Sequence, residues 1–143
     1  MIEHIQLSTE TEQHSAEHHD TRIIPLSAET SGSLPGRERG SIRKEWTQVE
    51  VTFALAFPDV YEVGMSHIGS AILYRTLNDH PWIAAERAYT PWPDREQQLR
   101  EAKLPLSSLE NGRSLADFDI VGFSLQYELC YSNVLSMLDL AGL

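Results

Sequence analysis

The chain has little cysteine, few basic side chains and no long apolar run. Its single cysteine, Cys130, cannot form an internal disulfide and alone supplies too few thiolates for a structural zinc site or an iron–sulfur cluster. Eleven basic side chains against 21 acidic ones give a net charge of −10, which argues against a general grip on nucleic-acid phosphates. Because no window approaches the ~20 apolar residues of a membrane span and no secretory signal is visible, we expect a cytoplasmic protein without a membrane partner.

What is present suits one folded domain preceded by a tail. Residues 1–36 are rich in Ser, Thr, Glu and His, show no sustained periodicity and predict a disordered acidic N-terminal tail. Four of the six histidines lie there, and imidazole is a common metal ligand, but ordering a flexible segment around a metal is costly, so a plain tail is favoured: His4, His14, His18 and His19. Residues 37–48 form a lead-in segment, and the folded domain is expected over 49–143.

From residue 49 onward, β-branched and aromatic runs alternate with helical spacing. Strands are predicted over 49–57, 83–89 and 119–125, and the last has the continuous apolar character of a strand buried on both faces. A first helix is indicated by Met65, Ile68, Ile72, Leu73 and Leu77, and it ends at 78–81. A second helix is expected over 95–103, then a short strand or loop over 104–109 and a turn at 111–112. A third helix is indicated by Tyr131, Val134, Leu135 and Leu138, and Gly142 is placed to end it.

This order of elements favours an α/β fold, namely a Rossmann-like or flavodoxin-like parallel sheet with flanking helices. Three strands are few for such a sheet, so we interpret it as incomplete and the chain as the N-terminal part of something longer. An incomplete sheet has an open edge and an uncovered apolar face. The sequence therefore predicts self-association through that edge, or poor solubility.

Two polar loops follow the first and third predicted strands, at the sheet edge where ligands bind in open parallel sheets. The first runs Pro58-Asp59-Val60-Tyr61-Glu62-Val63-Gly64-Met65-Ser66-His67, and the second runs Ser124-Leu125-Gln126-Tyr127-Glu128. Asp59 can cap a helix or accept a hydrogen bond from a ligand, Gly64 permits a close backbone approach, and Ser66 and His67 add polar groups. We expect the two loops to meet at one rim and to wall a cavity.

Each of these features also has an ordinary structural explanation. Asp59 and Gly64 suit a helix cap and a tight turn, and His67 suits a capping or surface residue. Cys130 suits a small buried hydrophobe better than a catalytic thiol. Glu62 and Glu128 can pair at the rim, although solvated carboxylates are the commoner outcome. Four aromatic side chains can stack on a planar ligand, but packing is favoured for them: Trp82, Trp92, Tyr89 and Tyr127.

The spacing Asp59-x-Tyr61-x-x-Gly64 resembles the D-x-H-x-x-G signature of cobalamin-binding domains, and Ser124-x-Gln126 falls where that family has its S-x-L or S-x-T element. Over 46–143, the strings FPDVYEVGMSH, PWPD and DIVGFSLQYEL are similar to the N-terminal domain of cobalamin-domain radical SAM proteins. The resemblance implies a following barrel that holds a four-iron four-sulfur cluster through C-x-x-x-C-x-x-C and binds S-adenosylmethionine. That motif is absent from this sequence, so the barrel is expected as a partner domain in cis and the chain alone as inactive.

The resemblance also implies cobalamin as a cofactor, facing Asp59, Tyr61, Gly64, Ser124 and Gln126, with Ser66 and His67 as further candidates. Tyr61 stands where the family has the histidine that ligates cobalt, and a phenol with a pKa of about 10 is a poor substitute for imidazole. A second hypothesis is therefore a degenerate, cofactor-free docking or substrate-recruiting module of the same protein. A third, a small nucleotide-binding domain, lacks any glycine-rich phosphate motif.

Overall fold

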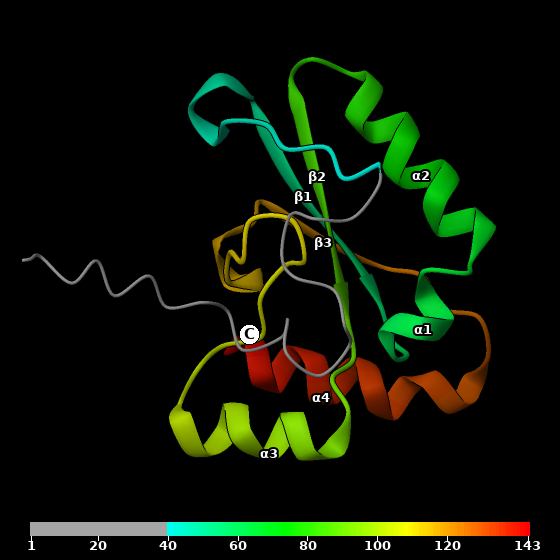
Figure 1. Cartoon of the computed structure of the whole chain (residues 1–143), viewed down its shortest axis with the longest axis vertical. Coiled ribbons are helices and arrows are strands. Elements are labelled where there is room, and N and C mark those ends of the chain that lie inside the picture. The colour runs from blue at the N-terminus through cyan, green and yellow to red at the C-terminus, as the bar shows by residue number, and fades with distance from the viewer. Residues whose placement is uncertain (1–39) are drawn as a thin grey trace, which may run out of the picture.

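The computed structural model describes residues 40–143 as a three-stranded parallel sheet with flanking helices (Figure 1). Strands β1 (Val51–Phe57), β2 (Ile83–Tyr89) and β3 (Ile120–Phe123) lie in the order β2-β1-β3. This arrangement confirms the predicted α/β, Rossmann-like fold, and all three strands occur where the sequence predicted them. The predicted tail, residues 1–36, and the first residues of the lead-in lie outside the described part of the chain.

The helices lie on both faces of the sheet. They are α1 (Tyr61–Gly64), α2 (Ile68–Asp79), α3 (Pro93–Ala102) and α4 (Tyr131–Ala141), with single 3-10 turns at Trp46–Gln48, Leu115–Asp117 and Glu128–Cys130. In Figure 1, α2 stands at the upper right of the sheet, whereas α3 and α4 lie at the bottom. None of the helices in residues 40–143 has the length and apolar character needed to span a bilayer.

The core lies between the sheet and the pair α3 and α4. Ala54 and Ala56 of β1 are at most 1% exposed and alternate with less buried neighbours that face α2. Around these small residues pack larger apolar side chains from other elements: Leu99, Leu106, Leu115, Met137 and Leu140. Alanines in the strands let the two helices approach the sheet closely, which explains why residues of low strand propensity occupy its centre.

The free edge of β2 is closed by the segment that follows α3. The Leu109 amide donates to the Arg87 carbonyl at 2.7 Å, and the Arg87 amide donates to Glu110 Oε2 at 2.7 Å. Arg87 Nε also donates to Glu110 Oε1 at 2.6 Å, so this fully buried carboxylate meets both the backbone and the guanidinium. Burial raises the pKa of Glu110, and the charge of Arg87 opposes that rise. The segment predicted as a short strand or loop, residues 104–109, thus covers the edge of β2.

The apolar residues that predicted the first helix are not the ones that it buries. The structure forms two helices there, α1 and α2, and the buried side chains of α2 are Tyr74 and Asn78. Ile68 and Ile72 are 75% and 59% exposed. Asn78 is buried because its amide donates to the Ala85 carbonyl at 3.0 Å and accepts from the Ala85 amide at 3.1 Å, which fastens α2 to β2.

The prediction that the third strand is buried on both faces is wrong for the described chain, since Ile120 is 46% exposed. β3 lies at the sheet edge and pairs with β1 alone, so among the described residues its side chains have a neighbouring strand on one side only. α4 likewise buries Met137, Leu140 and Ala141, whereas Tyr131 and Leu135 of the predicted stripe are 57% and 68% exposed. Gly142 does end α4, in the left-handed conformation at φ 76°.

Candidate functional site

Asp59 joins the loops that follow all three strands. Its carbonyl accepts from the Thr90 amide at 3.0 Å, in the loop after β2. Its Oδ2 accepts from the Tyr127 hydroxyl at 3.2 Å, in the loop after β3. Its Oδ1 accepts from the following amide, Val60, at 2.7 Å, which fixes the carboxylate at the start of α1. The two polar loops therefore meet at the carboxyl rim of the sheet, as the sequence predicted. The pocket beside this rim is lined by Tyr61 of the first loop and by no residue of the second, so it is not the cavity that the two loops were expected to wall together.

The second loop is fastened at the same rim. The Ser124 amide donates to the Ala56 carbonyl at 3.1 Å and so continues the pairing of β3 with β1. Gln126 Nε2 donates to Ser124 Oγ at 2.9 Å within the loop, and Gln126 is exposed. Further along, Asn133 Nδ2 of α4 donates to the Pro58 carbonyl at 2.9 Å. Asp59 and Ser124 thus stand on neighbouring loops.

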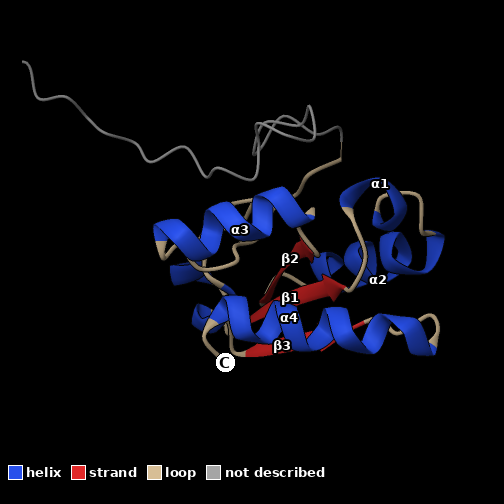
Figure 2. Cartoon of the chain, turned by 90° about the horizontal axis from the view of Figure 1, so that it is seen from below, coloured by secondary structure: helices blue, strands red, loops and turns tan. Residues whose placement is uncertain are grey.

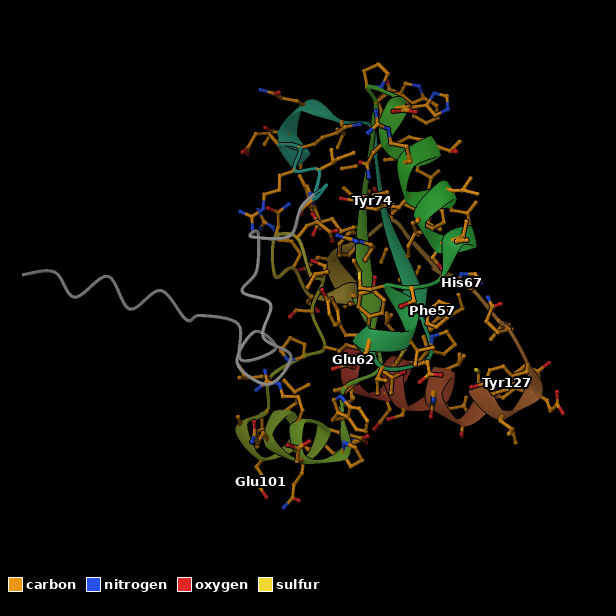
Figure 3. The ribbon with its side chains drawn as sticks, turned by 45° about the vertical axis from the view of Figure 1, so that its right-hand side comes forward. Phe57, Glu62, His67, Tyr74, Glu101 and Tyr127 are labelled. Atoms are coloured by element: carbon orange, nitrogen blue, oxygen red, sulfur yellow. The ribbon has the colours of Figure 1, made fainter. Side chains whose placement is uncertain are left out.

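Tyr127 and Cys130 form the outer part of this rim. Figure 3 shows Tyr127 on the loop that leads into α4. Hydrogen bonding to the Cys130 thiol, and then to Asp59, raises the pKa of Tyr127 to about 12. Cys130 itself is 2% exposed and precedes the first turn of α4, which confirms its prediction as a small buried residue.

Gly64 is needed for packing against another part of the rim. A Cβ atom at this position would lie 2.3 Å from Cε1 and 2.5 Å from Cδ1 of the Tyr89 ring. The Tyr89 hydroxyl donates to the sulfur of Met65 at 3.0 Å, and the Tyr61 ring meets the Tyr89 ring edge-on with centroids 5.5 Å apart. The close approach expected at Gly64 is therefore made by Tyr89 of β2, and Tyr61 lies beside it.

Ser66 and His67 have structural roles in the short helices after β1. Ser66 Oγ donates to the Glu62 carbonyl at 3.0 Å. His67 is the N-cap of α2: its Nδ1 accepts from the Ser70 amide at 3.0 Å, and its ring lies against Phe57 with centroids 5.2 Å apart (Figure 3). His67 thus caps a helix, which is the ordinary explanation given for it above.

A small pocket lies next to this rim, where β2 leads into α3. Its volume is about 80 Å³, and its walls include Tyr61, Tyr89, Thr90, Trp92 and Arg95. The Thr90 hydroxyl oxygen is buried and has no hydrogen-bond partner among residues 40–143, and Arg95 is 4% exposed. The sequence analysis missed Thr90 and Arg95, although Thr90 directly follows a predicted strand at its carboxyl end. A pocket of this size admits a few waters or a small polar group.

The remaining candidates do not form a catalytic or metal centre. Glu62 and Glu128 are both exposed, which agrees with the solvated alternative. Within residues 40–143 no three side chains of the metal-ligating types gather into a cluster.

Comparison with known proteins identifies the family. The family model described as "Radical SAM proteins, N-terminal" matches residues 69–143, slightly more than half of the chain. No curated protein matches, and no solved structure matches. The matched region holds Ser124, Gln126 and Tyr127 but begins after the D-x-Y-x-x-G segment. The chain belongs to the N-terminal family of radical SAM proteins.

Proposed function

We propose that this chain is the N-terminal module of a radical SAM protein and that it works by binding, with the carboxyl rim of its sheet as the binding edge. The observation that carries this proposal is the meeting of three loops at Asp59. In open parallel sheets this edge is where ligands bind. With a single cysteine the chain cannot supply three thiolates to a cluster, so the radical chemistry is assigned to another part of the protein.

Cobalamin is the ligand that the sequence resemblance implies, and the described residues fit it only in part. In favour, Asp59 and Ser124 lie on neighbouring loops at one rim. Against it, Tyr61 offers no imidazole and the ring of Tyr89 fills the space over Gly64. We therefore favour the second hypothesis, a module that kept the fold and docks or recruits without cobalamin.

A titration with hydroxocobalamin separates these two possibilities. If cobalamin binds the folded chain only, it raises the melting temperature, because a ligand at 100 times its Kd stabilises the folded state by about 2.7 kcal/mol. Binding also shifts the absorption spectrum of the cobalamin. We expect neither change in the wild-type chain. A cobalamin site would instead be established if cobalamin stabilises the wild-type chain and Asp59→Ala abolishes this effect. The control variant Asp94→Ala, at an exposed position of α3, should then keep it.

The docking role is tested with a cluster-loaded radical SAM barrel of the same family. Two exposed tryptophans provide a matched pair: Trp92 lies at the carboxyl end of β2 and is 48% exposed, and Trp82 precedes the amino end and is 43% exposed. We expect Trp92→Ala to weaken binding at least tenfold in calorimetry and Trp82→Ala to leave it unchanged. Absence of binding, or equal losses in both variants, would contradict the role of the rim.

A further inference from the structure

The buried face of α3 carries an arginine. Arg95 is 4% exposed, and Leu99, one turn further along, is 5% exposed; these two are the buried residues of the helix. A positive charge taken out of water needs compensation from acceptors or from an anion. Arg95 Nη1 donates to Oε1 of Gln98 at 3.2 Å, and this acceptor is neutral. Because Arg95 and Leu99 both line the pocket next to the rim, that pocket has a positively charged wall.

The pocket lies between the end of β2, α3 and the segment that covers the β2 edge. Figure 2 shows α3 beside β2 and away from β3. Leu106, Ser107 and Leu109 of the covering segment complete the wall opposite the helix. A ligand in this pocket therefore leaves the hydrogen bond between Asp59 and Tyr127 intact, because Tyr127 and its loop do not line it.

A second polar group of the wall, the Thr90 hydroxyl, lacks a partner. Its oxygen is buried and forms no hydrogen bond among residues 40–143, whereas the Thr90 amide donates to the Asp59 carbonyl at 3.0 Å. Buried polar groups in folded proteins are nearly always hydrogen-bonded, and one that is not lowers stability. A ligand oxygen that accepts from this hydroxyl removes that cost, so the pocket favours a ligand with an acceptor at Thr90.

The described residues that line the pocket include no carboxylate, although the chain has 21 acidic side chains. The acidic residues closest to the wall along the chain are paired or exposed. Glu96 pairs with Arg100 at 2.8 Å, and Glu110 pairs with Arg87 at 2.6 Å. Asp94 is exposed on the first turn of α3. The guanidinium thus sets the sign of the charge in the wall, and the pocket favours an anion.

We propose that this pocket binds a small carboxylate with a short apolar chain. The planar guanidinium of Arg95 matches the two oxygens of a carboxylate, and the Thr90 hydroxyl can donate to one of them. The apolar chain of the ligand packs against Leu99 and Leu106. The volume of about 80 Å³ holds a few waters, which a ligand of a few non-hydrogen atoms replaces. This inference goes beyond the docking role, and its tests need no barrel, so the two can fail separately.

The first test compares a charged and a neutral probe of the same shape. Propionate should raise the melting temperature of the full 143-residue chain in a saturable way, because it binds the folded state only. Propionamide, which lacks the charge, should not. Sodium chloride keeps the ionic strength constant, since salt alone screens the charges of an acidic chain. An equal rise with propionamide, a tighter response to inorganic phosphate, or no saturable rise with propionate would overturn the proposal.

The second test removes the hydroxyl and keeps the shape of the wall. Thr90→Val should be at least as stable as the wild type without ligand, because the hydroxyl has no partner there. Its Kd for propionate, measured by calorimetry, should rise about tenfold, since it loses a hydrogen bond to a charged group. Thr76→Val, at an exposed position of α2, is the matched control and should leave the Kd unchanged.

Arg95→Gln should abolish propionate binding, because it removes the charge. If this variant does not fold, Thr90→Val decides the question alone. Wild-type affinity in Thr90→Val, or an equal loss in the control Thr76→Val, would refute a carboxylate site in this pocket.

Discussion

The carboxylate of Asp59 accepts a hydrogen bond of 3.2 Å from the hydroxyl of Tyr127, 68 residues further along the chain. This bond joins the loop after β1 to the loop after β3, and the Asp59 carbonyl adds the loop after β2. A single residue thus sets the relative positions of the three loops at the rim. Loss of its side chain should change the rim more than the fold, because the sheet and its core do not include that carboxylate.

The titration of Tyr127 reports on this contact. The Cys130 thiol and Asp59 raise the pKa of Tyr127 to about 12, so Tyr127 should ionise at a higher pH than an ordinary tyrosine. Asp59→Asn removes the negative charge, so the pKa of Tyr127 should fall toward 10. Tyrosinate absorbance measures this pKa. Tyr127→Phe identifies the signal, and Glu62→Gln, at an exposed position of α1, is the control. An unchanged titration in Asp59→Asn would mean that the two side chains do not interact in solution.

Gly64 should tolerate no side chain while Tyr89 is present. Gly64→Ala places a methyl group 2.3 Å from the Tyr89 ring, and the resulting shift should lower the free energy of unfolding by about 1–3 kcal/mol. Urea denaturation measures this loss. The double variant with Tyr89→Leu should recover part of it, because the ring that causes the clash is gone. Ser66→Ala, at an exposed neighbouring position, should change stability little. Additive losses in the double variant would argue against this packing.

Glu110 should make stability depend on pH in an unusual direction for a carboxylate. Burial raises the pKa of Glu110 in the folded state above its unfolded pKa of 4.5. The contribution of this carboxyl to the free energy of unfolding is therefore fully present below pH 4.5 and is lost as the pH rises through the folded-state pKa. The free energy of unfolding of the wild type, relative to Glu110→Gln, should therefore decrease as the pH is raised from that point toward neutrality. Glu101→Gln, at an exposed site in α3, should run parallel to the wild type. A wild-type advantage that grows with pH would show that the ion pair with Arg87 outweighs burial.

Local sequence was enough to predict the three strands and the places of the three longer helices. The strand at 83–89 was predicted at its observed bounds, and Gly142 was recognised as the end of α4. The fold class and the meeting of the two polar loops also followed from the sequence, because parallel strands joined by helices bring their carboxyl ends to one edge whatever the side chains are.

Which face of each element is buried depended on tertiary contacts. Periodicity marked Ile72 and Leu135 as apolar, but it contains no information on whether another layer covers them. Asn78 and Glu110 are polar and yet buried, because each forms hydrogen bonds with a residue of β2. The sequence pattern does not show which residues these partners will be. The Thr90 and Arg95 pocket and the packing of Tyr89 over Gly64 likewise arise only when separate segments meet in space. Burial is a property of neighbours, and neighbours are decided by the folded chain.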